Sequence, residues 1–282
     1  MTTVYPFNLH VGPFTITGYG LMMMVGFLMG GWLIDRELRR RGWHHDYAAD
    51  ITVAAVIGGV LGAKLWYVAV TGDPGALFSR GGLVWYGGFI GGALAVLGNG
   101  WRLKVPLRWT CEVTAPALAA AYALGRIGCF LVGDDYGIPS TVPWAVSFPQ
   151  GLPPTTAGAM AHEFGIPLQP GMTPDTVLGV HPTQLYEAAI MIGVFMLLWR
   201  LRTHTKGTGW LFAIYLMLAG TERFLIEFLR AKEDHLKVLG GVTLAQLMGL
   251  GIVLLGGVLL SQWKGTVAPG EYLTSGKKKP AA

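Results

Sequence analysis

The sequence predicts an all-α integral membrane protein with about seven transmembrane helices, and three observations carry that prediction. Hydrophobic residues make up 52% of the 282 residues, whereas charged residues make up 13%, about half of the share typical of soluble domains. The mean hydropathy is +0.48. Apolar runs of about 20 residues recur along the chain, and each is long enough to cross a bilayer as a helix. Because these runs are continuous and do not alternate with polar residues, they favour helices over a closed barrel.

The apolar runs predict helices in seven places. These are residues 14–34, 48–70, 82–100, 110–132, 184–200, 208–228 and 242–262. Glycines four residues apart, as at Gly58 and Gly62 or Gly88 and Gly92, predict that some of these helices approach one another closely. Cys111 and Cys129 fall in one expected helix about 27 Å apart at 1.5 Å per residue, so we expect no disulfide between them within that helix.

Basic residues set the expected orientation of the helices in the membrane. Fourteen lysines and arginines follow the first, third, fifth and seventh expected helices, whereas only four lie on the opposite side. This bias predicts an N-terminus outside and a C-terminus in the cytoplasm, with a basic tail at residues 263–282. The net charge of +5 is spread over helix ends, so we expect no nucleic acid partner.

Residues 133–182 contain no lysine or arginine and are rich in proline and glycine. The bias of charges places this segment outside, and its composition predicts a long outer loop or small cap with short elements. Loops of this length usually have a function, such as shaping a binding site. We see no second soluble domain, and residues 1–282 are expected to form a single transmembrane helical domain.

Ionisable residues within membrane helices are costly and indicate a functional site by default. Arg126, Glu187, Arg223 and Glu227 are such residues, with Glu222 beside them. The predicted directions of the helices place all of them in the outer half of the membrane. Tyr19 and Tyr86 are expected at a similar depth.

Two interpretations give these charges different kinds of role, one structural and one in binding. In the first, Arg223 pairs with Glu227 one helical turn away, Arg126 pairs with Glu187, and the pairs only hold the helices together. In the second, the two arginines bind an anion, because a guanidinium group presents a planar fork suited to phosphate. That anion would be a phospholipid head group or a transported ion.

Four sequence motifs decide between these interpretations by their resemblance to a known family. They are Gly18-Tyr19-Gly20 in the first expected helix, Gly125-Arg126-Ile127-Gly128 in the fourth, His181-Pro182-Thr183-Gln184-Leu185-Tyr186-Glu187 at the start of the fifth, and Arg223-Phe224-Leu225-Ile226-Glu227-Phe228-Leu229-Arg230 in the sixth. In this order and topology they resemble the bacterial prolipoprotein diacylglyceryl transferases, from about Tyr19 to the last helix.

The resemblance implies a reaction and a set of partners. The family transfers the diacylglyceryl group of phosphatidylglycerol to the lipobox cysteine thiol of a prolipoprotein, forming a thioether and releasing glycerol phosphate. It works in the bacterial plasma (inner) membrane among membrane lipids, with the active site toward the outer leaflet. No metal or cofactor is implied.

The resemblance also implies roles for individual residues. Arg126 is expected on the lipid phosphate, Arg223 on the charge of the leaving phosphate, and Glu227 as its acidic partner. Tyr19, Asp134, Gly137 and Glu187 are expected to help bind substrate; Asp134 stands where the family usually has Glu.

Three positions depart from the family's pattern. Tyr86 replaces a histidine that is a favoured general base, Cys129 replaces an asparagine, and Ala219 replaces a tyrosine. A phenol near pKa 10 is a poor base for a thiol near pKa 8.5 unless Arg126 or Arg223 lowers its pKa. Otherwise Tyr86 is expected to donate a hydrogen bond to the phosphate. The base is then His181, Glu227 or an oxygen of the lipid phosphate.

Two alternatives to the transferase stay open at this point. One is a family member with altered or lost activity, for which Tyr86 is the best support. The other is a membrane lipid or anion transporter, although the internal repeats common in transporters are not apparent in the sequence.

Overall fold

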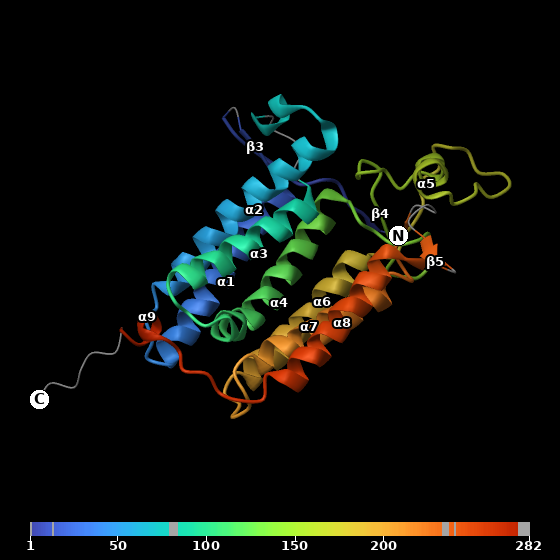
Figure 1. The fold of residues 1–282 in the computed structure, drawn as a ribbon. Helices are drawn as coiled ribbons and strands as arrows, with labels where there is room; N and C mark the ends of the chain where they lie inside the picture. Colours follow the sequence, from blue (N-terminus) through green and yellow to red (C-terminus); the bar gives the residue numbers. More distant parts are fainter. Residues whose placement is uncertain (1, 13, 79–83, 233–236, 240, 276–282) are drawn as a thin grey trace, which may run out of the picture. The chain divides into compact units, whose positions relative to one another are not determined.

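The computed structural model describes residues 2–12, 14–78, 84–232, 237–239 and 241–275 and is mainly helical (Figure 1). The helices are α1 (Gly18–Arg40), α2 (Tyr47–Thr71), α3 (Trp85–Arg102), α4 (Leu107–Val132), α5 (Ala157–Phe164), α6 (Thr183–Leu201), α7 (Trp210–Ile226), α8 (Leu244–Gln262) and α9 (Glu271–Thr274), with a 3₁₀ helix at Pro74–Phe78. The strands are β1 (Thr2–Thr3), β2 (Asn8–Val11), β3 (Phe14–Thr17), β4 (Val146–Ser147), β5 (Lys237–Leu239) and β6 (Val242–Thr243).

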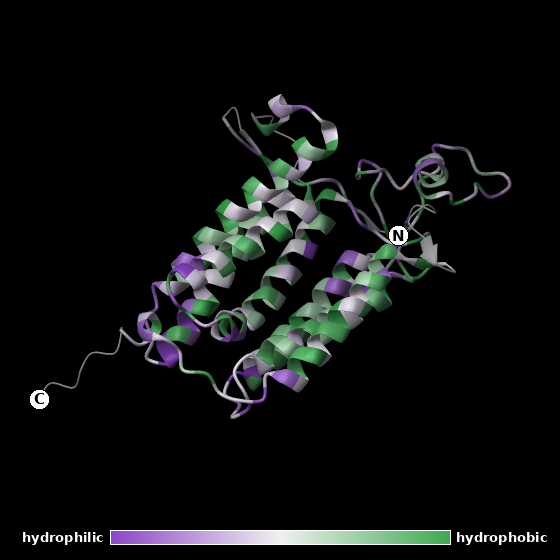
Figure 2. Cartoon of the chain, in the orientation of Figure 1, coloured by the Kyte–Doolittle hydropathy of each residue, from purple (hydrophilic) through white to green (hydrophobic). Residues whose placement is uncertain are grey.

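A helix occurs at each of the seven predicted places, so the mainly helical fold class is confirmed. Five helices (α1, α2, α4, α6 and α8) are long and apolar enough to cross a membrane, while α3 and α7 have 18 and 17 residues. Figure 2 shows mainly apolar helices, with the strongly hydrophilic residues mostly at helix ends and in connecting segments. Arg80, Lys277, Lys278, Lys279 and the first two residues of the predicted helix 82–100 lie outside the described residues.

The predicted start of the first helix at residue 14 is wrong. Residues 14–17 form β3, which pairs antiparallel with β2 and places Ile16 opposite Leu9. The stretch Thr15-Ile16-Thr17 consists of β-branched residues, which favour strands. Helix α1 begins directly afterwards, where the Thr17 hydroxyl accepts a hydrogen bond from the backbone N–H of Gly20 at 3.1 Å, as helix N-caps do.

The chain forms two compact units. The first comprises residues 1–26, 118–203 and 213–262, and the second comprises residues 27–117, 204–212 and 263–282. The prediction of a single domain stays a prediction. The first unit contains all four sequence motifs, and the second contains α2, α3 and the described part of the C-terminal segment.

In the first unit, segment 133–182 folds around a small hydrophobic core. Tyr136, Val146, Phe148, Met160 and Val180 are buried together there. Helix α5 is capped at both ends, because the Thr156 hydroxyl accepts from the N–H of Ala159 and Gly165 adopts a left-handed conformation. Strand β1 pairs in parallel with β4, which ties the start of the chain to this segment. The segment therefore has short elements around a small core of its own, and its position as an outer loop or cap stays a prediction.

In the second unit, helices α2 and α3 lie side by side (Figure 1) and cross through glycines. A Cβ atom added at Gly62 would collide with the carbonyl oxygen of Gly87 and lie 2.8 Å from the Cα of Gly91, so only glycine fits at this crossing. The predicted close approach of glycine-bearing helices is confirmed here, because Gly58 and Gly62 of α2 lie against Gly87 and Gly91 of α3.

Replacing Gly62 with alanine should therefore destabilise the protein. The added methyl group meets backbone atoms, which cannot move aside as a flexible side chain can, so we expect a loss of about 1–3 kcal/mol of unfolding free energy. Thermal unfolding in detergent measures it. Gly98→Ala in α3 is the matched control, because a Cβ there meets nothing within 4 Å. Equal stability of the two variants would contradict the prediction.

The C-terminal segment packs within the second unit by specific contacts. The Trp109 ring N–H donates to the carbonyl oxygen of Val267 at 2.7 Å, and the Tyr272 hydroxyl donates to Asp50 at 2.5 Å. The backbone N–H of His44 donates to the carbonyl oxygen of Leu273, whose side chain is fully buried. The described part of the predicted tail, residues 263–275, is thus an ordered part of the fold.

Candidate functional site

A sharp turn at the end of α4 builds the site in the first unit. Gly133 adopts φ 72°, and its N–H and that of Asp134 donate to the carbonyl oxygen of Cys129, which ends the helix. Asp135 follows with φ 57°, a conformation that is uncommon for a residue other than glycine. Strained backbone of this kind persists only where surrounding contacts stabilise it.

The motif that begins α6 fastens this turn. The Thr183 hydroxyl donates to the carbonyl oxygen of Asp135 at 3.0 Å, and the Gln184 amide donates to that of Asp134 at 2.6 Å. His181 exchanges backbone hydrogen bonds with Gly137 and Ile138. Three successive parts of the motif bind the backbone of residues 134–138. The polar residues of the motif therefore have a structural role, because they fix the direction of the two aspartate side chains.

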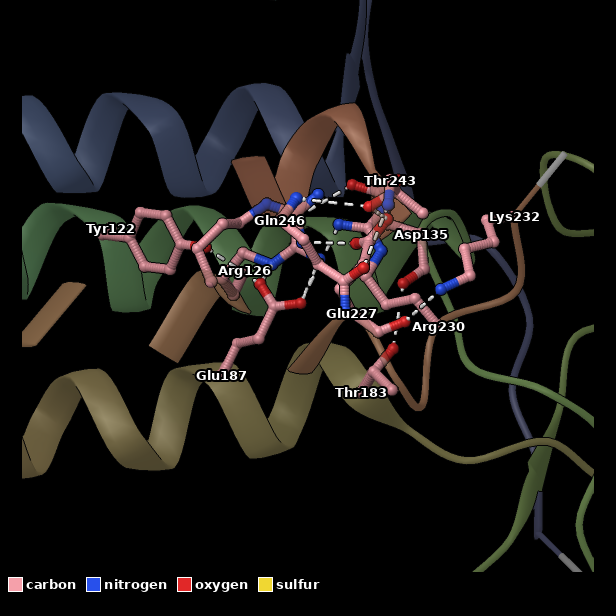
Figure 3. A network of polar contacts seen from close by, with 11 residues as sticks. Tyr122, Arg126, Asp135, Thr183, Glu187, Glu227, Arg230, Lys232, Thr243 and Gln246 are labelled. Carbon is pink, nitrogen blue, oxygen red and sulfur yellow. Dashed lines mark hydrogen bonds and ion pairs between the residues drawn. The ribbon is translucent and has the colours of Figure 1, made fainter. Parts of the chain in front are cut away.

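Arg126 is the centre of the ion-pair network that Figure 3 shows. Its Nη2 donates to Glu187 Oε1 at 3.0 Å, its Nε contacts Glu187 Oε2, and its Nη1 donates to Asp135 Oδ2 at 2.9 Å. The side chain of Glu187 has no exposed surface and also accepts from the Tyr122 hydroxyl at 3.0 Å. The predicted pair of Arg126 with Glu187 is confirmed, and the fork of the guanidinium group is used on two carboxylates at once.

Three guanidinium groups act on Asp135, two of them by direct contact. Arg126 and Arg230 each form an ion pair with one of its carboxylate oxygens, and the charge of Arg223 also acts on it. Burial raises the pKa of the Asp135 carboxyl, but Arg230 and Arg126 lower it further than burial raises it, so its pKa lies below the ordinary value. With 42% of its side chain exposed, Asp135 marks an accessible point at which positive charge converges.

Arg223 and Glu227 form the second predicted pair, at 2.8 Å. The other carboxylate oxygen of Glu227 accepts from the Thr243 hydroxyl at 2.9 Å. Thr243 also caps α8, because its hydroxyl accepts from the N–H of Gln246 while the Gln246 side chain accepts from the N–H of Thr243, a reciprocal capping box. The pair of Arg223 and Glu227 is thus anchored to the start of α8.

Asp134 differs from its neighbour Asp135. Its Oδ1 atom is buried and has no hydrogen-bond partner among the described residues, and its carboxyl group interacts with the Cys129 thiol. Burial raises the pKa of Asp134, the negative charge of Asp135 raises it further, and the opposing effect of Arg126 is smaller; the result is a pKa of about 6. Asp134 therefore changes its charge close to neutral pH.

The remaining predicted site residues have varied positions. Tyr19 on α1 lies against Gly128 of α4 and is near enough to feel the charges of Asp134 and Arg126. His181 Nδ1 is 3.2 Å from the Tyr186 hydroxyl. A Cβ added at Gly137 would lie 2.6 Å from the carbonyl oxygen of Leu229, so this glycine is needed for packing. Tyr86 belongs to the second unit, and its predicted role stays a prediction.

One group of possible metal ligands occurs within the site. The ligand atoms of Cys129, Asp134 and Asp135 lie within 4.8 Å of one another. Both oxygens of Asp135 are paired with guanidinium groups, and two fixed positive charges beside the group disfavour a cation. The chemistry of these surroundings suits an anion.

Comparison with known proteins agrees with this chemistry. Residues 6–262 match the prolipoprotein diacylglyceryl transferase family. The chain belongs to this family. Proteins named phosphatidylglycerol–prolipoprotein diacylglyceryl transferase are similar to it in Nitratidesulfovibrio vulgaris (30% identity, 89% of this chain and 91% of the relative), Vibrio atlanticus (30%, 92% and 90%) and Clostridium tetani (32%, 76% and 81%).

Within this member of the family, three residues of the network were not predicted to belong to the site: Asp135, Arg230 and Tyr122. Asp135 directly follows the predicted site residue Asp134, and Arg230 stands at the end of a quoted motif without a predicted role. The turn after α7, at residues 227–229, brings Arg230 back beside Gly137, with which it forms an antiparallel bridge. The available signal was the position of Arg230 as the last residue of the motif that begins at Arg223. Tyr122, four residues before Arg126, gave no comparable signal.

Proposed function

We propose that this protein transfers the diacylglyceryl group of phosphatidylglycerol to the lipobox cysteine thiol of prolipoproteins. The products are a thioether and glycerol phosphate, and the protein acts as a transferase of the family to which it belongs. The ion pairs of Arg126 and Arg230 with Asp135, with the charge of Arg223 acting on the same carboxylate, carry the proposal. Charge-assisted contacts from guanidinium groups are the strong contacts for phosphate, and phosphate is the group that leaves in this reaction.

The exposure of the arginines supports a division of roles. Arg223 keeps 28% of its side chain exposed, more than Arg126 or Arg230. We therefore assign Arg223 to the lipid phosphate and to the charge that develops on it as the carbon–oxygen bond breaks. The two carboxylate oxygens of Asp135 are bound by Arg126 and Arg230, as two oxygens of a phosphate group would be. When the lipid phosphate enters, Asp135 moves aside and the phosphate accepts hydrogen bonds from these two arginines.

The position in the membrane belongs to the same proposal. We propose seven transmembrane helices in the bacterial plasma (inner) membrane, with the N-terminus outside and the C-terminus in the cytoplasm. The cap of residues 133–182 then lies outside and the site faces the outer leaflet. The predicted charge bias supports this orientation. An exported lipobox cysteine reaches the turn at residues 133–137 from the outer side, and the lipid reaches it from within the leaflet.

A transfer assay tests the proposal. The purified protein in phosphatidylglycerol vesicles is given a lipobox peptide, and the peptide mass and released glycerol phosphate are measured. We expect a gain of one diacylglyceryl unit that needs the peptide's cysteine, with none for a Cys→Ser peptide and none for Arg126→Ala. Absence of transfer by the folded protein, while a related enzyme run alongside is active, would refute the proposal and point to another donor or to transport.

A further inference from the structure

The proposed reaction needs a group that takes the proton of the attacking thiol, and most carboxylates of the site are poor candidates. Glu187 is paired with Arg126, Glu227 with Arg223, and Asp135 with both Arg126 and Arg230. A carboxylate held by a guanidinium group is stabilised in its charged form and binds a proton weakly. These contacts leave Asp134 as the acidic residue of the turn that has no ion pair with a guanidinium group among the described residues.

We propose that Asp134 is the catalytic proton acceptor for the substrate thiol. This inference rests on the proposed transferase function. The observation that carries it is the geometry of the turn: the Oδ1 atom of Asp134 is buried and has no hydrogen-bond partner among the described residues. It lies one residue from Asp135, where the three guanidinium groups converge. A proton acceptor is needed beside the phosphate position, and Asp134 occupies such a place.

The surroundings of Asp134 fit this role in two further ways. The Gln184 amide holds its carbonyl oxygen at 2.6 Å, so the backbone that carries the carboxyl group is fixed. The Cys129 sulfur lies within 4.8 Å of a carboxylate oxygen of Asp134, so this carboxyl group already has a thiol beside it. Cys129 itself is buried in α4 and free of disulfide, whereas the substrate thiol would approach the Asp134 carboxylate.

The proton step can be written with all atoms and electrons balanced. The S–H proton of the lipobox cysteine moves to the Asp134 carboxylate, and the sulfur electron pair forms the carbon–sulfur bond to the glyceryl carbon. The bond between that carbon and the phosphate oxygen breaks, and its electron pair stays on the oxygen. Glycerol phosphate leaves, and the proton of Asp134 passes to the released phosphate or to water.

The charged and titratable groups around Asp134 give the expected pH dependence. They are Asp135, Cys129, Arg126 and Arg230 in addition to Tyr19 on α1. Burial and the charge of Asp135 bring the pKa of Asp134 to about 6. A base must be deprotonated to act, so kcat/KM should rise with pH through about 6 and then level off, and a base with its pKa near the working pH is the most effective.

The test compares Asp134→Asn with the wild-type protein on two acceptor peptides. With the cysteine peptide, Asp134→Asn should lower kcat/KM about 100-fold or more, as loss of a general base does, and should remove the rise near pH 6. With a selenocysteine peptide, whose selenol is already ionised at neutral pH, most of the lost rate should return. Asp134→Glu should keep the activity and the acidic limb on both peptides.

Three controls make the outcome decisive. Arg223→Gln should stay slow on both peptides, because an ionised nucleophile does not replace a phosphate ligand. Asp175→Asn, a change at an exposed carboxylate of the same unit, should behave as the wild type. Glu222→Gln removes another buried carboxylate with an unpartnered oxygen, and rescue of this variant by the selenol, instead of Asp134→Asn, would overturn the inference.

The results separate this inference from the proposed function. If the wild-type protein transfers lipid and Asp134→Asn does so with the same rate and pH profile, Asp134 is not the proton acceptor while the transferase stands. If the wild-type protein transfers nothing, both fall. If Asp134→Asn does not fold, the wild-type pH profile decides, because a flat profile across pH 6 for the cysteine peptide would overturn the inference.

Discussion

Replacing Arg126 with lysine should abolish transfer and destabilise the first unit, although the positive charge is kept. Arg126 contacts Glu187 through two nitrogens and Asp135 through a third. Lysine is a point charge on a flexible stem and cannot satisfy both carboxylates with this geometry. Glu187 has no exposed surface, so water cannot replace a lost partner. Breaking a buried ion pair by changing one member typically costs about 3–5 kcal/mol.

Two measurements test this prediction. Thermal unfolding in detergent should show a large loss of stability for Arg126→Lys, and the lipobox peptide assay should show a fall of about 100-fold or more, since loss of one preorganised donor typically costs that much. Normal turnover by this variant would contradict the role of the guanidinium fork at the phosphate.

A double variant separates the structural part of the effect from the chemical part. Replacing both Arg126 and Glu187 with methionine removes both buried charges, and such exchanges are often neutral or stabilising in other proteins. We expect Arg126→Met/Glu187→Met to unfold at a higher temperature than Arg126→Lys and still to be inactive. Recovery of transfer together with stability would mean that the pair only holds α4 and α6 together, as the first of the two sequence interpretations states.

The two ion pairs were predictable from the sequence because each follows from a simple rule. Arg223 and Glu227 are four residues apart on a helix, and Arg126 and Glu187 have the same expected depth in apolar runs, where a charge needs a partner. The helices themselves follow from the length of the apolar runs. The pairing did not reveal function, since pairs of this kind also occur in sites without chemistry.

The contacts that form the site lie in irregular backbone, where the spacing of residues along the sequence does not predict which side chains meet. Asp135 points between Arg126 and Arg230 because its backbone has positive φ and Thr183 holds its carbonyl oxygen. Arg230 reaches Asp135 only because the chain turns after α7. The strand at residues 14–17 was missed for a related reason: its few apolar residues continue the run of α1, and their alternation is too short to separate them by hydropathy.

The functional difference between Asp134 and Asp135 could not be predicted from the sequence either. In the sequence, either of two adjacent aspartates after a helix could equally well be solvated or bind a cation. The turn gives Asp135 two guanidinium partners and buries Oδ1 of Asp134 without one. Their pKa values move in opposite directions as a result, and that separation is what permits one of them to hold the arginines while the other takes up a proton.

Replacing Arg223 with glutamine should strongly slow transfer while leaving the fold intact, in contrast to Arg126. The side chain of Arg223 is 28% exposed, and its partner Glu227 keeps the hydrogen bond from Thr243, so the carboxylate is not left without a donor. Loss of a group that stabilises charge mainly in the transition state lowers kcat and kcat/KM together. We expect kcat to fall about 100- to 1,000-fold and the unfolding temperature to change little.

The division of the effect between kcat and KM identifies what Arg223 does. A fall in kcat with little change in KM for phosphatidylglycerol would place its contribution on the leaving phosphate, whereas a rise in KM alone would place it on ground-state binding of the lipid. Arg200→Gln, at an exposed position near the end of α6, is the matched control and should be fully active. An active and stable Arg223→Gln would remove Arg223 from the chemistry and leave the phosphate to the donors of Arg126 and Arg230.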